Sequence, residues 1–242
     1  MKIKQTQPKI KAMAFGGCSF TWGQGLYYYS ALESLIPDPP YGYNANLHNE
    51  IHQLFREKWR WPTLVADHFN TIAITHHENG GSNDLIVEYW DTSFRMSDRV
   101  MIPAFHKNQR TVPTNPIKYA DVSHFVFQFT QWMRSRFPIP VNGKIKMLDA
   151  YDCGDRNHPE YQQAFLEYID NLDLEPAKDN TKIGTFHQQI IEKDVADVKK
   201  FLQGLEEQGI KTYVLCWPHD HVELIEKDEW LSSRFIQFIH ND

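Results

Sequence analysis

The chain has 242 residues, of which 41% are hydrophobic and 14% are aromatic. This length and composition exclude wholesale disorder and fit one domain, residues 1–242, that carries large insertions. The formal net charge of −6 argues against a general nucleic-acid-binding protein, because such proteins carry a surplus of basic residues. No apolar run reaches the roughly 18 residues of a membrane-spanning helix, and no apolar signal segment begins the chain. We therefore expect a cytoplasmic protein with neither a membrane nor a nucleic-acid partner.

The three cysteines are Cys18, Cys153 and Cys216, which lie far apart in the sequence. No C-x-x-C pair indicates zinc, so buried reduced thiols are the simpler interpretation. The neighbouring His76 and His77 make a poor joint metal site, because successive side chains of a strand point to opposite faces. We expect no metal and no other cofactor.

Apolar runs and helical periodicity alternate along the chain. Strands are predicted at 12–18, 71–75, 124–130 and 210–217, and 235–239 is either a short last strand or the end of a helix. Helices are predicted at 61–69, 85–96, 161–171, 182–208 and 228–234. Gly209 is the expected stop of the long helix 182–208. Two long insertions are expected at 24–58 and 135–182.

This alternation predicts an α/β fold, a parallel sheet of about four or five strands with helices on both faces. The carboxyl ends of parallel strands lie on one edge of the sheet, so the turns that follow the strands converge there. These turns supply Ser19, then Asn79, Gly80, Gly81, Ser82 and Asn83, then Thr130, Gln131 and Arg134, and finally His219, Asp220 and His221.

Such a set of side chains suits acyl transfer. Ser19 would need a base to become a nucleophile. The backbone N–H groups of Ser19 and Gly81, with the side-chain amide of Asn83, would stabilise the oxyanion. Purely structural interpretations stay open, because Ser19 and Asn83 are residue types that also cap helices, and Gly80 and Gly81 suit a tight turn. His221 alone is compatible with an ordinary surface histidine.

Two sequence blocks carry a resemblance to a known family. The run Gly17-Cys18-Ser19-Phe20-Thr21-x-Gly23 resembles the first block of the SGNH (GDSL-like) hydrolases, with Cys18 where Asp is usual. The run Asn79-x-Gly81-x-Asn83 resembles their second block, whose glycine donates to the oxyanion hole. The chain looks most similar to divergent SGNH-like proteins of phages and bacteria. The resemblance implies a flavodoxin-like three-layer α/β/α sandwich with Ser19 as the nucleophile.

Two family blocks are missing. After the third predicted strand, Thr130-Gln131-Trp132 stands in place of Gly-x-Asn-Asp, so Gln131 is a candidate for the missing amide donor. The family's final Asp-x-x-His is absent, and the chain ends in His240-Asn241-Asp242.

Two functions follow as hypotheses. The first is a serine esterase or deacylase of the SGNH type that acts on a small-molecule or glycan O-acyl ester. Its site would consist of Ser19 as nucleophile, His221 as base (with His219 and His240 as alternatives), Asp220 as the orienting carboxylate, Gly81 and Asn83 as the oxyanion hole, and Gln131 and Arg134 as substrate-binding residues. The second is a catalytically inactive SGNH-like domain that serves as a binding, structural or phage-associated protein. The sequence leaves the oligomeric state open.

Overall fold

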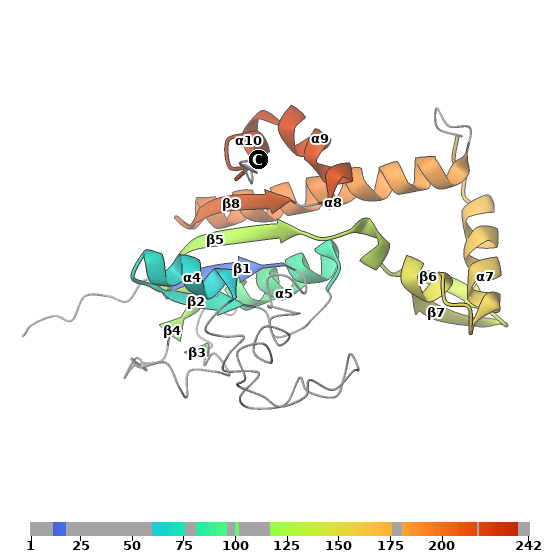
Figure 1. The fold of residues 1–242 in the computed structure, drawn as a ribbon, viewed down its shortest axis with the longest axis horizontal. Helices are drawn as coiled ribbons and strands as arrows, with labels where there is room; N and C mark the ends of the chain where they lie inside the picture. The colour runs from blue at the N-terminus through green and yellow to red at the C-terminus, as the bar shows by residue number, and fades with distance from the viewer. Residues whose placement is uncertain are drawn as a thin grey trace, which may run out of the picture.

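A parallel four-stranded sheet in the order β2-β1-β5-β8 forms the centre of the fold (Figure 1). The computed structural model describes residues 12–17, 60–75, 81–95, 100–101, 117–175, 181–216 and 218–236. The strands are β1 (Ala12–Gly16), β2 (Ile72–Thr75), β5 (Val122–Phe129) and β8 (Lys211–Cys216). All neighbouring pairs are parallel, so the four carboxyl ends share one edge of the sheet.

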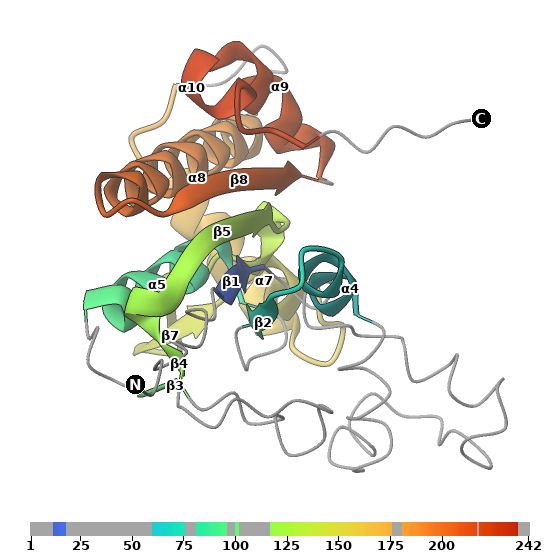
Figure 2. The same cartoon turned by 90° about the vertical axis from the view of Figure 1, so that its left-hand side faces the viewer.

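Helices cover both faces of this sheet (Figure 2). On one side lie α5 (Asn83–Arg95) and α8 (Lys182–Glu207), and on the other lies α4 (Trp61–His68). The predicted α/β fold class, with a parallel sheet flanked by helices, is confirmed. The long helix ends where it was expected, because Gly209 follows it with a φ of +83°, a conformation that glycine adopts without strain.

Aromatic side chains fill the layer between the sheet and the two helices α5 and α8. The ring of Phe125 on β5 packs edge-on against Trp90 of α5, with ring centroids 5.3 Å apart, and against Phe201 of α8 at 5.4 Å. On the opposite face Phe15 of β1 packs edge-on against Trp61 of α4 at 5.2 Å. Alternate residues of β1 enter different layers, Ala12 and Ala14 the first and Met13 and Phe15 the second, as the pleat of a strand requires.

The predicted insertion at 135–182 forms a lobe beside the sheet. It contains an antiparallel hairpin of β6 (Phe137–Val141) and β7 (Lys144–Leu148), followed by α6 (Ala150–Cys153) and α7 (Pro159–Asp170). The helix α7 matches the one predicted at 161–171, whereas the hairpin was not predicted. The lobe packs on the first turns of α8, which extend beyond the sheet (Figure 1).

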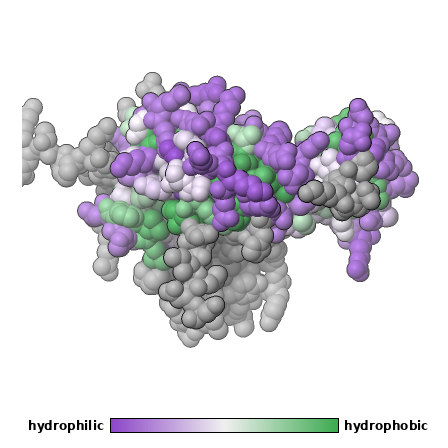
Figure 3. All heavy atoms as spheres, turned by 90° about the horizontal axis from the view of Figure 1, so that it is seen from above, coloured by the Kyte–Doolittle hydropathy of each residue, from purple (hydrophilic) through white to green (hydrophobic). Residues whose placement is uncertain are grey.

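After β8 the chain forms two helices, α9 (His219–Lys227) and α10 (Glu229–Ser232). The sequence predicted only the second, as 228–234. The exposed side of α9 is charged, and the coloured surface in Figure 3 combines hydrophilic areas with smaller apolar patches. Phe235 then pairs with Val214 of β8 in an isolated parallel bridge, so the chain runs strand-like there, whereas 237–239 lie outside the described residues.

The remaining described elements are short. They are β3 (Val100–Met101), β4 (Ile117–Lys118), and two 3₁₀ turns, η2 (Tyr119–Asp121) and η3 (Trp132–Arg134). The strands β3 and β4 pair antiparallel, in a stretch between the predicted helix 85–96 and the predicted strand 124–130 for which no strand was expected. The predicted insertion at 24–58 lies outside the described residues.

Candidate functional site

The carboxyl edge of the sheet holds a buried polar cluster. Its members follow three of the four strands or come from the helix behind them: Ser82 and Asn83 after β2, Thr130 after β5, His221 after β8, and Asp194 in the middle of α8. Each of these residues is at most 3% exposed. Polar groups buried so deeply normally have hydrogen-bond partners. Within the described part of the chain, however, the hydroxyls of Ser82 and Thr130 and both ring nitrogens of His221 have none.

Asn83 joins three elements through its side-chain amide. Its Oδ1 accepts a hydrogen bond from the backbone N–H of Thr130 at 2.8 Å. Its Nδ2 donates to the backbone carbonyl of Thr130 at 3.1 Å and to Oδ2 of Asp194 at 2.7 Å. Both amide hydrogens are therefore in use. As a donor to an oxyanion, Asn83 would have to release one of these bonds.

His221 lies in the first turn of α9 with its ring fully buried. Its Nε2 is 3.6 Å from Oδ2 of Asp194, the same oxygen that receives the amide of Asn83. The imidazole also packs against the ring of Phe129, with centroids 5.2 Å apart. The carboxylate of Asp194 thus lies between an amide from the β2 side of the sheet and an imidazole from the β8 side.

Asp220 is placed differently from the expected orienting carboxylate. Its side chain is 48% exposed, and its Oδ2 lies 3.4 Å from Nε2 of His187 on α8. The ring of His187 in turn packs against Trp132, with centroids 4.7 Å apart. The structure therefore pairs Asp220 with His187, and Asp194 with His221.

The other predicted site residues are only partly described. Ser19, Asn79 and Gly80, like the alternative base His240, lie outside the described residues, and of His219 only the backbone is described. Gly81 directly precedes Ser82 and α5, so it belongs to the same edge of the sheet as the buried cluster.

Gln131 and Arg134 lie where the sheet edge meets the lobe. Oε1 of Gln131 accepts a hydrogen bond from the hydroxyl of Tyr151 in α6. Arg134 belongs to η3 and is half-buried, and its Nε is buried without a hydrogen-bond partner in the described ranges. Both side chains therefore border the junction of the sheet and the lobe.

The two described cysteines are buried free thiols. Burial, together with the charges of Asp152 and Asp149, raises the pKa of Cys153 to about 11. Burial also raises the pKa of Cys216, whose Sγ lies 3.3 Å from the carbonyl oxygen of Pro218. At neutral pH neither is a thiolate, so neither is a nucleophile. Cys18 lies outside the described ranges.

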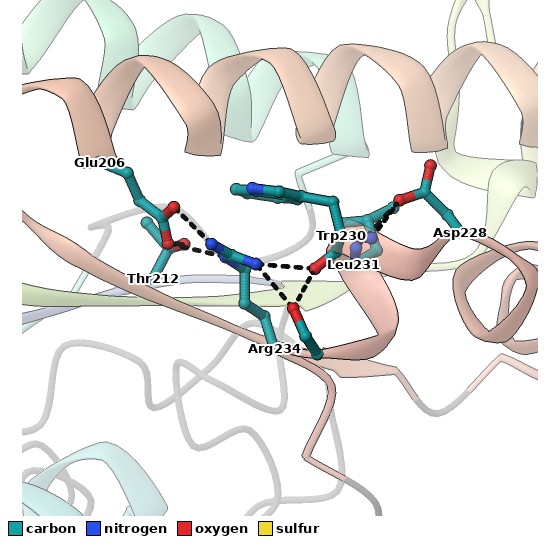
Figure 4. A network of polar contacts seen from close by, with 7 residues as sticks. Glu206, Thr212, Asp228, Trp230, Leu231 and Arg234 are labelled. Atoms are coloured by element: carbon teal, nitrogen blue, oxygen red, sulfur yellow. Dashed lines mark hydrogen bonds and ion pairs between the residues drawn. The ribbon is translucent and has the colours of Figure 1, made fainter.

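A second polar network lies at the opposite edge of the sheet (Figure 4). There Arg234 makes two short contacts with Glu206, Nε to Oε1 at 2.7 Å and Nη2 to Oε2 at 2.6 Å, and its guanidinium lies 3.8 Å from the ring centroid of Trp230. The network borders an open depression of about 560 Å³ beside Lys211 and Tyr213. Since its charged groups are paired with one another, this network is structural.

Searches of the described residues found neither a group of three metal-ligating side chains nor a helix that could cross a bilayer. Comparison with models of protein families, with curated proteins and with solved structures found no match.

Sequence reasoning missed Asp194. The signal was present, because this acidic residue interrupts the apolar stripe of the long helix, between Ile191 and Val198. An acidic residue in such a stripe is buried, and a buried carboxylate needs a hydrogen-bond donor or a positive charge beside it.

Proposed function

We propose that this chain is a serine esterase or deacylase of the SGNH type, with Ser19 as nucleophile and His221 as general base. The observation that supports this most strongly is the buried, incompletely hydrogen-bonded polar cluster at the carboxyl edge of a parallel sheet. Ligands of open α/β sheets bind at this edge. The two sequence blocks that resemble the SGNH family, around Ser19 and Gly81, follow the neighbouring strands β1 and β2.

The proposed reaction follows from the groups available. Ser19 attacks the acyl carbon while His221 takes its proton, and this proton then leaves with the alcohol as the acyl-enzyme forms. Water, activated by the same histidine, hydrolyses the acyl-enzyme. Because Nε2 of His221 faces Asp194, Nδ1 is the nitrogen left for this proton transfer. The backbone N–H groups of Ser19 and Gly81 stabilise the oxyanion, and Asn83 takes part if one of its bonds is released.

The proposed substrate is a small-molecule or glycan O-acyl ester. Gln131 and Arg134 are assigned to substrate binding because they border the junction between the sheet edge and the lobe. The buried Nε of Arg134, without a partner in the described chain, is a donor suited to an oxygen of the substrate.

The test is Ser19→Ala in hydrolysis of p-nitrophenyl acetate, together with labelling by a fluorophosphonate probe. We expect kcat/KM to fall by about 10³-fold or more and labelling to disappear, because the nucleophile is removed. Ser232→Ala, at an exposed serine of α10, is the matched control and should behave as wild type. Unchanged hydrolysis in Ser19→Ala would contradict the proposal.

The second candidate function is a catalytically inactive SGNH-like domain that binds a ligand or serves as a structural, phage-associated component. Two observations favour it: the ring of His221 is fully buried, and both amide hydrogens of Asn83 are engaged. Wild-type protein that neither hydrolyses short-chain esters nor reacts with the probe would support this candidate.

A further inference from the structure

We propose that Asp194, and not the neighbouring Asp220, is the positioning residue for His221, and that Asn83 holds its carboxylate in place. The catalytic meaning of this pairing rests on the proposed function. The pairing itself does not, and it can be measured in the absence of any activity.

The first argument is the geometry around one oxygen atom. Oδ2 of Asp194 lies 2.7 Å from Nδ2 of Asn83 and 3.6 Å from Nε2 of His221. The second distance is slightly longer than a hydrogen bond, and such contacts in ligand-free sites tighten when substrate binds. In the tightened contact Nε2–H of His221 donates a hydrogen bond to Oδ2 of Asp194, so the ring proton stays on Nε2 and Nδ1 carries none.

The second argument is burial. Asp194 is 3% exposed and the ring of His221 is fully buried. A carboxylate removed from water is costly unless donors surround it, and an imidazole without a partner is costly as well. The contact between the carboxylate and the imidazole offsets both desolvation costs, which explains why the two groups are buried together.

The third argument is that Asn83 fixes the carboxylate. The amide is held at both ends by the peptide groups of Thr130, through Oδ1 at 2.8 Å and Nδ2 at 3.1 Å. Its second Nδ2 hydrogen is thereby directed at Asp194. The position of the carboxylate is thus set by the end of β5, the strand whose Phe129 packs against the ring of His221.

The neighbouring charged groups are directed elsewhere. Asp220 on α9 lies against His187. Asp84 on α5 forms no ion pair with His221 in the described ranges; its charge, like that of Asp194, adds to the raised pKa of Lys193, which is due mainly to the hydrogen bond with Asp197. From β5 the ring of His221 meets the uncharged ring of Phe129. Among the carboxylates in the described part of the chain, Asp194 is the one paired with His221.

The test is the tautomer of His221 in the full-length, ¹⁵N-labelled protein. It is read from long-range ¹H–¹⁵N correlations, recorded at a pH high enough for the ring to be neutral. His221→Gln identifies its signals. We expect the proton on Nε2 and a bare Nδ1. A proton on Nδ1 would overturn the proposal, and this measurement needs no variant of Asp194.

Variants distinguish Asp194 from Asp220 as the partner of His221. Asp194→Leu removes the acceptor and should abolish the preference for the Nε2–H form, whereas Asp194→Asn, which keeps an oxygen for Nε2, should restore it. The matched control, Asp220→Leu, should leave the tautomer of His221 unchanged. Loss of the preference in Asp220→Leu but not in Asp194→Leu would overturn the proposal.

Activity gives a second readout if Ser19→Ala confirms the esterase. Asp194→Leu should then lower kcat by about 10²-fold or more with little change in KM, as expected when a catalytic histidine loses its orienting group. If Ser19→Ala shows no effect, the proposed function fails while the tautomer still decides the pairing.

Discussion

Gly16, the last residue of β1, stands where the chain has no room for a side chain. A Cβ at this position would lie 2.9 Å from Cζ of Phe125, 3.0 Å from Nε1 of Trp90 and 3.1 Å from Cγ2 of Ile86. All three neighbours are buried in the core, so they have little freedom to move away. We expect Gly16→Ala to lower the free energy of unfolding by about 1–3 kcal/mol, measured by urea denaturation.

A second glycine provides the matched control. Gly204 lies within α8, and a Cβ there would meet nothing within 4 Å. Because alanine is a better helix former than glycine, Gly204→Ala should raise the free energy of unfolding by about 0.5–1 kcal/mol. If Gly16→Ala were equally stabilising, the packing described around the end of β1 would be wrong.

At the scale of elements, the pair of Glu206 and Arg234 fastens the end of α8 to the segment that follows α10 (Figure 4). The guanidinium of Arg234 lowers the pKa of Glu206, and a hydrogen bond from Thr212 adds to this. A carboxylate whose pKa is lowered by folding stabilises the protein above its unfolded-state pKa. This stabilisation is lost as the pH falls through the lowered value.

Glu206→Gln should therefore destabilise the protein at pH 7, by about 1 kcal/mol after allowance for partial solvent exposure. The difference from wild type should begin to shrink below about pH 4, where the carboxyl is protonated in the unfolded chain, and should vanish as the pH falls through the lowered pKa of the folded protein. Urea denaturation at a series of pH values measures both effects.

The control for this prediction is Glu223→Gln on α9. Glu223 pairs with Lys227 at 2.6 Å, but the two side chains are 75% and 66% exposed. Solvent screens such a pair, so stability should stay close to that of wild type at every pH. An equal loss in both variants would mean that the network in Figure 4 contributes no more than a surface ion pair.

The elements that could be predicted from the sequence are those with strong periodicity. The long helix was predicted at 182–208 and is Lys182–Glu207, because its apolar residues recur every three or four positions. The hairpin of β6 and β7 was missed although Asn142-Gly143 is a strong turn signal, with φ of +49° and +75°.

The candidate site could be predicted only in part. That the turns after β2, β5 and β8 meet at one edge follows from the parallel sheet. Which side chains pair at this edge depends on the position of α8 behind the sheet, and periodicity does not supply it. Asp220 was assigned to a histidine by proximity in sequence, whereas Asp194, far from His221 in the chain, makes the contact.

At the scale of the whole molecule, α8 connects two separate hydrophobic cores. Its first turns carry Phe186 into the core of the lobe, and its later turns carry Val198, Phe201 and Leu202 into the core of the sheet. Asp194, a member of the buried cluster, lies on the same helix within the part that packs on the sheet, which begins at Ile191. Movement of the lobe on α8 would therefore act close to the candidate site.

Phe186→Ala tests whether the two cores are independent. The ring of Phe186 packs against Phe137 of β6 at 5.0 Å and Phe165 of α7 at 6.0 Å, so its removal leaves a cavity in the lobe. The free energy of unfolding should fall by about 3–5 kcal/mol, which is a large part of the stability that a small core provides. Hydrogen exchange followed by mass spectrometry should show faster exchange in β6 and β7 while β5 keeps its protection.

Phe201→Ala is the matched change in the core of the sheet. The ring of Phe201 packs against Phe125 of β5 at 5.4 Å, so its loss should speed exchange in β5. Exchange in the lobe should also become faster in this variant, because α8, the helix that supports the lobe, is anchored on the sheet. Loss of protection in β5 and β6 together in Phe186→Ala would instead mean that both cores unfold as one unit.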